Sequence, residues 1–303
     1  MEEPILPRQR RVGGILRLLL MDNLIITAAV TGSITDRSKS PYHPITAEEI
    51  ATAAVDAWRA GAAMIHLHAR TEDGTPTQDP ARFADLIDRI TATGCDAILN
   101  LSTGSAGGRA GFEERLACLA LRPEMASFDC GSVNFETWAF VNPPSFLEMM
   151  AQRMLEFDVK PEIECFDTGM IYAGRRLAER GLLPPPLHFQ FVMGSAGGIP
   201  PEPQHLVHML AALPPGATWS VCALGRGQLP MNVMAILHGG HARTGLEDNV
   251  YYAYRQLAHS NAQLVERLVH LSRELGREVA SPAEACRILS MPRREARPTN
   301  PVQ

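Results

Sequence analysis

AEEIATAAVDAWRAGAAMIHLHA, residues 47–69, carries the pattern that decides the fold. Its first half spaces apolar residues as on one face of a helix, and its second half ends in a short apolar run. A helix that leads directly into a buried strand is the repeating unit of α/β proteins, whose parallel sheets are covered by helices. The stretch therefore predicts one helix–strand unit of such a sheet.

The same unit recurs about eight times along the chain. We expect strands at residues 24–30, 63–69, 97–101, 125–130, 162–166, 188–193, 218–223 and 240–245. We expect helices at residues 47–60, 80–92, 112–120, 144–157, 174–180, 203–212, 231–237, 254–275 and 282–289. Eight parallel strands favour closure into a (β/α)8 TIM barrel, and an open doubly wound sheet is the alternative.

The pattern indicates one catalytic domain with short ends. Residues 21–290 carry the barrel units, so residues 1–20 are interpreted as an N-terminal extension that precedes Met21. Residues 291–303 are rich in proline and arginine, which predicts a disordered tail. The 46% of hydrophobic residues in the 303-residue chain is enough for one large core.

Composition narrows the class of partner. The net charge of -5 is spread along the chain without a basic cluster, which argues against a nucleic-acid partner. The apolar run VGGILRLLL at residues 12–20 is too short to span a bilayer, so no membrane partner is expected. The six cysteines form no CxxC pair, and several lie in apolar strand-like runs, as reduced thiols do in a cytoplasmic protein.

The sharpest motif is the pair His66 and His68 in the strand at residues 63–69. Side chains alternate faces along a strand, so both imidazoles point the same way. Two imidazoles at this spacing suit one metal ion. The alternative is a pair of inward histidines held by hydrogen bonds, which would be costly to desolvate without partners.

A second motif, GGHARTGLEDN at residues 239–249, follows at the end of the last expected strand. Glu247 is placed to complete a site of two histidines and one carboxylate, which leaves room for substrate or water. Asp248 beside Arg243 is a candidate general base. The alternative is that Glu247 and Asp248 stabilise the N-terminus of the following helix.

Two glycine-rich loops, STGSAGG at residues 102–108 and GSAGG at residues 194–198, each follow an apolar strand. Such loops let backbone N–H groups approach an anion such as a carboxylate or a phosphate. Ordinary tight turns are the alternative for both loops.

Together these motifs resemble the β-keto acid cleavage enzyme family. The similarity rests on ITAAVTGS (26–33), AGAAMIHLHAR (60–70), STG (102–104), RPEMAS (122–127), GSVNF (131–135), PEIE (161–164), QFVMG (190–194), GGHARTGLEDN (239–249) and SNAQLVERL (260–268). The resemblance implies a (β/α)8 barrel that assembles as a homotetramer and carries a divalent metal, normally zinc. It also implies a reaction of a β-keto acid with acetyl-CoA that yields a new acyl-CoA and acetoacetate.

The resemblance also implies roles for individual residues. The metal ligands fall on His66, His68 and Glu247, and the catalytic base falls on Asp248, which Arg243 orients. The substrate-binding hydroxyl and loop residues fall on Ser102, Thr103, Gly104 and Ser127, with Ser102 also catalytic in holding the intermediate.

Two positions depart from the family pattern within the substrate-binding set. Ser105 stands where the family often has a second glycine, which narrows the anion loop. Ile34 stands where members that act on amino-bearing substrates have a glutamate, so a neutral, apolar substrate is expected.

Three other functions remain as alternatives. A metal-dependent hydrolase of the amidohydrolase type uses the same histidine pair, although there it belongs on the first strand. A class II aldolase-type lyase would use a metal-stabilised enolate without coenzyme A. A catalytically inactive barrel would only bind a metabolite, but the chain retains a full set of catalytic residue types, namely His66, His68, Arg243, Glu247 and Asp248.

Overall fold

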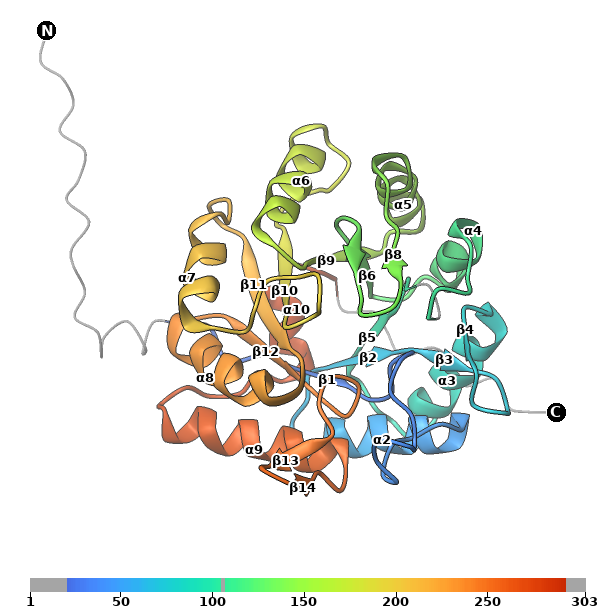
Figure 1. The fold of residues 1–303 in the computed structure, drawn as a ribbon, viewed down its shortest axis with the longest axis vertical. Coiled ribbons are helices and arrows are strands. Elements are labelled where there is room, and N and C mark those ends of the chain that lie inside the picture. The colour runs from blue at the N-terminus through green and yellow to red at the C-terminus, as the bar shows by residue number, and fades with distance from the viewer. Residues whose placement is uncertain (1–20, 105–106, 293–303) are drawn as a thin grey trace, which may run out of the picture.

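The computed structural model describes residues 21–104 and 107–292. Eight parallel strands close into a barrel in the order β1-β12-β11-β10-β9-β6-β5-β2, with helices around its outside (Figure 1). This confirms the expected (β/α)8 TIM barrel. The barrel strands are β1 (Ile26–Ala29), β2 (Met64–Leu67), β5 (Ile98–Leu101), β6 (Met125–Asp129), β9 (Lys160–Cys165), β10 (His188–Met193), β11 (Thr218–Ala223) and β12 (His241–Thr244).

The helices lie close to their expected positions. They are α2 (Ala47–Arg59), α3 (Pro80–Thr91), α4 (Phe112–Leu116), α5 (Pro144–Phe157), α6 (Thr168–Glu179), α7 (Pro203–Ala211), α8 (Gln228–His238), α9 (Asn261–Glu274) and α10 (Pro282–Ile288). Two 3-10 helices follow α4 and β11, at Ala117–Leu121 and Gly225–Gly227.

Two predicted boundaries are wrong. The helix expected at 174–180 begins six residues earlier as α6, because the Asp167 carboxylate caps it by accepting a hydrogen bond from the Met170 N–H. The first part of the helix expected at 254–275 is instead an antiparallel hairpin, β13 (Tyr251–Ala253) with β14 (Gln256–Leu257). Arg255 makes the turn in the left-handed region at φ 59°, where a helix cannot continue.

Two further hairpins follow barrel strands. They are β3 (Ala69–Arg70) with β4 (Pro76–Thr77) after β2, and β7 (Val133–Asn134) with β8 (Ala139–Phe140) after β6. Because all three hairpins lie in strand-to-helix connections, they stand at the carboxyl-end mouth of the barrel. Barrel enzymes build their active sites at this mouth.

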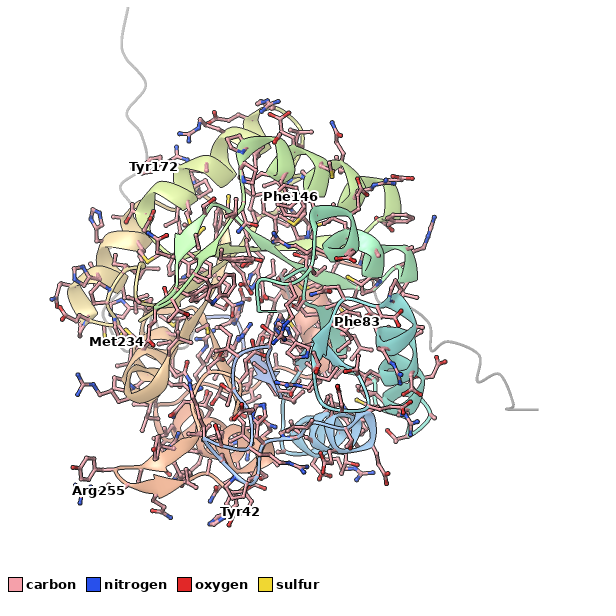
Figure 2. All side chains as sticks on the ribbon, turned by 45° about the vertical axis from the view of Figure 1, so that its right-hand side comes forward. Tyr42, Phe83, Phe146, Tyr172, Met234 and Arg255 are labelled. Carbon is pink, nitrogen blue, oxygen red and sulfur yellow. The ribbon has the colours of Figure 1, made fainter. Side chains whose placement is uncertain are left out.

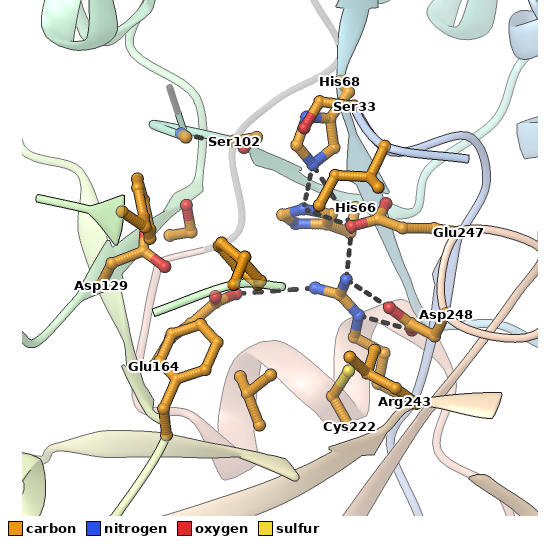
Figure 3. Close-up of a pocket in the computed structure, with 18 of the residues that line it drawn as sticks. Ser33, His66, His68, Ser102, Asp129, Glu164, Cys222, Arg243, Glu247 and Asp248 are labelled. Carbon is orange, nitrogen blue, oxygen red and sulfur yellow. Dashed lines mark hydrogen bonds and ion pairs between the residues drawn. The ribbon is translucent and has the colours of Figure 1, made fainter. Parts of the chain in front are cut away.

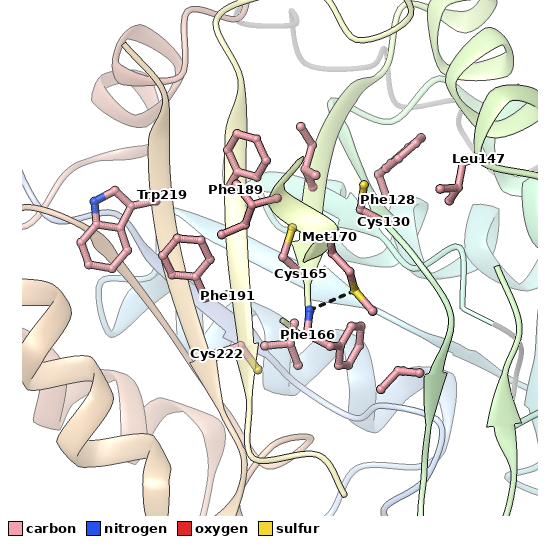
Figure 4. Packing of buried hydrophobic residues seen from close by; sticks show 14 of the residues in the cluster. Phe128, Cys130, Leu147, Cys165, Phe166, Met170, Phe189, Phe191, Trp219 and Cys222 are labelled. Atoms are coloured by element: carbon pink, nitrogen blue, oxygen red, sulfur yellow. Dashed lines mark hydrogen bonds between the residues drawn. The ribbon is translucent and has the colours of Figure 1, made fainter. Parts of the chain in front are cut away.

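The strand β10, with the sequence HFQFVM, shows how the two faces of the sheet differ. Phe189 and Phe191 are fully buried on its outer face, in the cluster between strands and helices (Figure 4). His188 and Gln190 alternate with them and point into the barrel. The apolar core therefore lies mainly between sheet and helices, while the barrel interior is polar.

Side chains fill the layer between the barrel and its helices. Phe83 on α3 and Phe146 on α5 are buried, whereas Tyr172 on α6 and Arg255 in the β13–β14 turn project outward (Figure 2). All six cysteines lie in the described part of the chain as buried thiols. Among the described helices, none combines the length and the apolar character needed to cross a bilayer.

Helix α10 closes the amino-end floor of the barrel. Ala285 and Leu289 pack there against the first residues of the strands, in one cluster with Met64 and Met125. Met291, at which we expected the tail to start, is 9% exposed and belongs to the same cluster. The expected extension at 1–20 and the rest of the expected tail, 293–303, lie outside the described residues.

Candidate metal-binding active site

The mouth of the barrel holds a pocket to which five barrel strands or their loops contribute the predicted residues (Figure 3). His66 lies on β2 and His68 directly after it, and Arg243 lies on β12 with Glu247 and Asp248 in the following turn. These five residues come together although the histidines are about 180 positions from the carboxylates in the chain. The pairing of β1 with both β2 and β12 explains this, because it places the ends of the two strands on either side of β1.

His66, His68 and Glu247 converge on one point. The two imidazole Nε2 atoms are 3.2 Å apart, and Glu247 Oε1 lies 3.8 Å from His66 Nε2 and 3.3 Å from His68 Nε2. Two nitrogens and one carboxylate oxygen are a donor set that zinc favours. His66 Nδ1 and Glu247 Oε2 are buried without a hydrogen-bond partner. The residues thus fit a divalent metal better than a closed set of hydrogen-bonded histidines.

Glu247 does not lie at the N-terminus of a helix. The turn that carries Glu247 and Asp248 leads into β13, and the next helix, α9, begins only at Asn261. The alternative in which the two carboxylates stabilise a helix N-terminus is therefore wrong. Instead, the loop after β1 holds Glu247, since the Thr35 hydroxyl donates to the Glu247 carbonyl oxygen at 3.1 Å.

Arg243 links the candidate metal ligand Glu247 to the candidate base Asp248. Its Nε donates to Asp248 Oδ2 at 3.0 Å and its Nη2 donates to Asp248 Oδ1 at 3.0 Å, a bidentate pair. The same Nη2 donates to Glu247 Oε1 at 2.6 Å, and Nη1 lies 3.5 Å from Glu164 Oε1 (Figure 3). The Arg243 guanidinium therefore fixes the orientation of Asp248 and also donates to Glu247 Oε1, the oxygen nearest the two imidazoles.

The two neighbouring carboxylates have opposite pKa shifts. Burial opposes ionisation of Glu247, but the Arg243 guanidinium and the two imidazoles outweigh it and hold the pKa of Glu247 well below its usual range. Burial and the nearby Glu247 charge raise the pKa of Asp248 above its usual value, although Arg243 acts in the other direction. Glu247 is thus a permanent anion suited to a cation, whereas Asp248 is the better proton acceptor.

The predicted anion loop lines the pocket in part. Ser102, Gly104 and Ser127 face the pocket, and the Ser102 hydroxyl oxygen accepts a hydrogen bond from the Gly104 N–H at 3.0 Å. Thr103 lies behind them, where its N–H donates to Ser127 Oγ at 3.0 Å and its hydroxyl donates to the Ser127 carbonyl oxygen at 2.8 Å. Ser105 lies outside the described residues.

The second glycine-rich loop, residues 194–198, does not contribute to the pocket lining among the described residues. It turns tightly, with the Gly198 N–H donating to the Ser195 carbonyl oxygen at 3.0 Å. The tight-turn interpretation therefore holds for this loop. Ile34 lines the pocket at its rim, with 55% of its surface exposed.

Two acids lie deeper in the pocket as a pair, and sequence reasoning missed Asp129 and the pairing. Asp129 ends β6 and Glu164 lies next to it on β9, where the two residues are register partners. Burial, together with the Asp129 charge, raises the pKa of Glu164 well above its usual range. Glu164 lines the pocket and is the alternative to Asp248 as the base, whereas the Asp167 carboxylate caps α6. The alternation in PEIEC indicates that Glu164 points inward, although it cannot identify its partner.

Four aromatic residues were also missed. Phe135, Trp138, Phe140 and Phe166 form one wall of the pocket. They come from the β7–β8 hairpin and the end of β9, and no periodic pattern in the sequence distinguishes them from core residues.

Comparison with known proteins agrees with this geometry. The sequence pattern of the beta-keto acid cleavage enzyme family matches residues 23–291. The chain belongs to the β-keto acid cleavage enzyme family. It is therefore an enzyme of the class that cleaves β-keto acids and transfers their acyl group.

Three members of the β-keto acid cleavage enzyme family illustrate the range of its reactions. The chain is 46% identical to the 3-keto-5-aminohexanoate cleavage enzyme of Acetoanaerobium sticklandii, over 89% of this chain and 99% of that protein. It is 41% identical to the 3-oxoadipate:acetyl-CoA acetyltransferase of Cupriavidus necator, over 89% and 96% of the two chains. It is 37% identical to the 3-dehydrocarnitine:acetyl-CoA trimethylamine transferase of Rhizobium meliloti, over 89% and 97%.

Solved structures show the same fold. A ternary complex of ObcA with a C4-CoA adduct and oxalate has a TM-score of 0.73 at 22% identity and covers 83% of this chain and 68% of that one. At this level of identity the likeness extends to the barrel alone.

Proposed function

We propose that this enzyme converts a β-keto acid and acetyl-CoA into the corresponding acyl-CoA and acetoacetate. The observation that carries the proposal is the single guanidinium of Arg243, which holds the candidate base Asp248 within the same hydrogen-bond network as the metal ligand Glu247. This arrangement brings a proton acceptor next to the position at which a keto oxygen would be polarised.

A divalent metal held by His66, His68 and Glu247 would act as a Lewis acid on the keto oxygen of the substrate. Side chains of the protein bind the substrate carboxylate and transfer the proton. The hydroxyls of Ser102 and Ser127 donate hydrogen bonds to the substrate carboxylate. Asp248 removes one proton from the carbon between the keto group and the carboxylate, and its raised pKa makes it a stronger base than an exposed aspartate.

The bond changes balance as follows. The resulting carbanion attacks the thioester carbon of acetyl-CoA, and the coenzyme A thiolate leaves. That thiolate adds to the keto carbon of the substrate, and the bond between the keto carbon and the former carbanion carbon breaks. The acyl-CoA is released, and Asp248 returns its proton to the other fragment, which becomes acetoacetate.

The tail of the substrate is uncharged in this proposal. Ile34 at the pocket rim offers no counter-charge to an ammonium tail. The names of the three relatives, by contrast, describe substrates with amino, carboxylate and trimethylamine groups.

The proposed enzyme also has a defined metal, assembly and location. The metal is zinc, which the two imidazoles and one carboxylate favour. The enzyme works as a homotetramer, which light scattering of the purified protein tests. Its location is the cytoplasm, which suits six buried thiols.

Isotope labelling tests the reaction. The enzyme is incubated with 3-oxohexanoate and acetyl-CoA whose acetyl group carries 13C, and the products are separated by mass spectrometry. We expect unlabelled butanoyl-CoA and acetoacetate that contains both labelled carbons. A hydrolase would form acids without consuming acetyl-CoA, an aldolase-type lyase would form no butanoyl-CoA, and an inactive barrel would form no product. Any of these three results overturns the proposal.

A further inference from the structure

The aromatic wall of the pocket is built as one unit. Ring centroids lie 4.9 Å apart for Phe135 and Trp138, 5.9 Å for Trp138 and Phe140, and 6.2 Å for Phe135 and Phe166. Phe140 and Phe166 are buried, whereas Phe135 and Trp138 are half-buried and expose ring surface to the pocket. Aromatic surface that is exposed inside a pocket is typical of a site that binds an apolar part of a ligand.

The β7–β8 hairpin that carries Phe135 and Trp138 sits between the two glycine-rich loops. A Cβ on Gly108 would lie 3.3 Å from Cε3 of the Trp138 ring, and a Cβ on Gly197 would lie 2.5 Å from the Asn134 carbonyl oxygen. Each loop thus approaches the hairpin where a side chain would collide or crowd. The loop at 194–198 therefore supports the hairpin through this contact, although the loop itself does not line the pocket.

Arg115 on α4 ties the hairpin to the predicted anion loop. Its guanidinium is 1% exposed and donates to the Thr103 carbonyl oxygen at 2.8 Å and to Asn142 Oδ1 at 2.7 Å. The same group lies 4.7 Å from the centre of the Phe140 ring. The separation between the carboxylate end of the pocket, at Ser102, and its aromatic wall is therefore fixed by one buried side chain.

We propose that the β7–β8 hairpin recognises the substrate tail, and that the substrate is a β-keto acid whose tail is uncharged and bulky, of the size of a butyl chain or a phenyl ring. This inference rests on the proposed function. With the keto acid head at the proposed metal ligands, the tail lies against Phe135 and Trp138 in the pocket that Val192, Leu224 and Ile34 also line. Aromatic faces bury such a group without an unpaired charge.

Asp129 is the charged group that faces this wall from β6. Its Oδ2 lies 4.0 Å from Arg115 Nη2, so a guanidinium already stands beside it. A cationic tail would have to compete with that guanidinium for Asp129, and a carboxylate tail would meet the Asp129 carboxylate as a like charge.

Two measurements test the proposal. In the first, kcat/KM is measured for 3-oxo acids with methyl, butyl, phenyl, ammonium and carboxylate tails, in the wild-type enzyme and in Trp138→Ala. We expect butyl and phenyl tails to be preferred, and Trp138→Ala to lower kcat/KM for them by roughly 10- to 100-fold while the methyl-tailed acid changes little. Trp138→Phe should recover part of the loss. Tyr254→Ala, an aromatic truncation outside the pocket, is the control and should change none of these values.

The second measurement reads binding without turnover. A non-cleavable carboxylic acid with a phenyl tail is titrated while tryptophan fluorescence is recorded. The chain has three tryptophans, Trp58, Trp138 and Trp219. The ligand-induced change should vanish in Trp138→Phe and persist in Trp58→Phe, whose residue lies on the outer helix α2.

The outcomes separate the two hypotheses. If no 3-oxo acid yields an acyl-CoA but the Trp138 signal responds to the phenyl-tailed acid, the proposed reaction is wrong and tail recognition stands. If acyl-CoA forms but an ammonium or carboxylate tail is preferred, or Trp138→Ala lowers all tails equally, the tail inference is overturned and the reaction stands.

Discussion

Gly32, in the loop after β1, packs directly against the side chain of Glu247. A Cβ at position 32 would lie 2.5 Å from Glu247 Cγ and 3.1 Å from its Cδ, and Gly32 has φ of +68°. Its carbonyl oxygen accepts a hydrogen bond at 2.7 Å from the buried guanidinium of Arg70, which holds the loop in place. The loop after the first strand therefore forms one wall of the space that the Glu247 carboxylate, the proposed metal ligand, occupies.

This contact predicts that Gly32→Ala weakens metal binding while the barrel stays folded. The added methyl group must displace Glu247 from the two imidazoles, and loss of support for a ligand usually lowers metal affinity by about 10- to 100-fold. Gly216→Ala is the matched control, because Gly216 has a similar φ of +79° and no atom within 4 Å of its Cβ position. Metal affinity measured by competition with a chelator should fall only in Gly32→Ala. Equal affinities in the two variants would contradict the role of Gly32.

Removal of either imidazole should release the metal. His66→Ala and His68→Ala each leave two of three protein ligands, so both variants should lose the stoichiometric divalent ion and all turnover. The circular dichroism spectrum should stay that of the wild type, since the barrel core lies between sheet and helices. Metal content by mass spectrometry decides the matter, and full occupancy in both variants would refute the site.

Substitutions of Asp248, the proposed base, and of Arg243, which holds it by two hydrogen bonds, test their roles separately. Asp248→Asn keeps the shape but accepts no proton, so substrate should still bind while kcat falls by roughly 100-fold or more. Arg243→Lys should also be impaired, because an ammonium cannot reproduce the two parallel bonds to Asp248. Steady-state kinetics at saturating acetyl-CoA measures both. Near-normal turnover in Asp248→Asn would direct attention to Glu164.

The polar interior of the barrel predicts a pH-dependent stability. Glu162 is fully buried, and burial, with Asp129 and Asp248 nearby, raises its pKa to about 7. The folded protein therefore keeps a proton that the unfolded chain has lost above its ordinary pKa of 4.5. That contribution to stability is full below pH 4.5 and is lost as the pH rises through about 7.

Glu162→Gln cannot ionise, so it should escape this loss. In urea titrations, its free energy of unfolding relative to the wild type should increase from pH 5 to pH 8. Glu266→Gln, on the exposed side of α9, is the control for removal of a carboxylate. A difference between Glu162→Gln and wild type that is constant with pH would show that Glu162 ionises normally.

Arg115 should matter for both stability and substrate binding. Arg115→Met leaves the acceptors on Thr103 and Asn142 unpaired, which should lower the free energy of unfolding by about 2 kcal/mol or more. Arg115→Lys should restore part of the stability but raise KM for the β-keto acid more than KM for acetyl-CoA, because the anion loop and the hairpin are no longer held together. Arg153→Met, an exposed arginine on α5, is the control.

The sequence predicted the candidate site residues that are close neighbours in the chain. The alternation of strand side chains identified His66 and His68 as a pair. Arg243, Glu247 and Asp248 lie within one short sequence motif. These two groups come together on either side of β1 because the barrel closes, and the eight similar units of the sequence predicted that closure.

The remainder depended on contacts between distant segments. Asp129 and Glu164 meet only because β6 pairs with β9, and no pattern within either strand specifies that register. Trp138 resembles any other apolar loop residue until the hairpin folds over the pocket. The start of α6 was missed because Thr168 and Gly169 are weak helix formers, and the Asp167 cap overrides that preference.

Two late elements of the chain complete the barrel during synthesis. Strand β12 pairs with β1, and helix α10 covers the floor. The first strand emerges from the ribosome early but must wait for His241–Thr244 to obtain its second neighbour. Contacts this distant in the chain slow folding. Until α10 (Pro282–Ile288) has been synthesised, Met64 and Met125 lack the helix that covers them at the floor of the barrel. We therefore expect nascent chains released before that helix to stay open, and to be cut by proteases that the finished barrel resists.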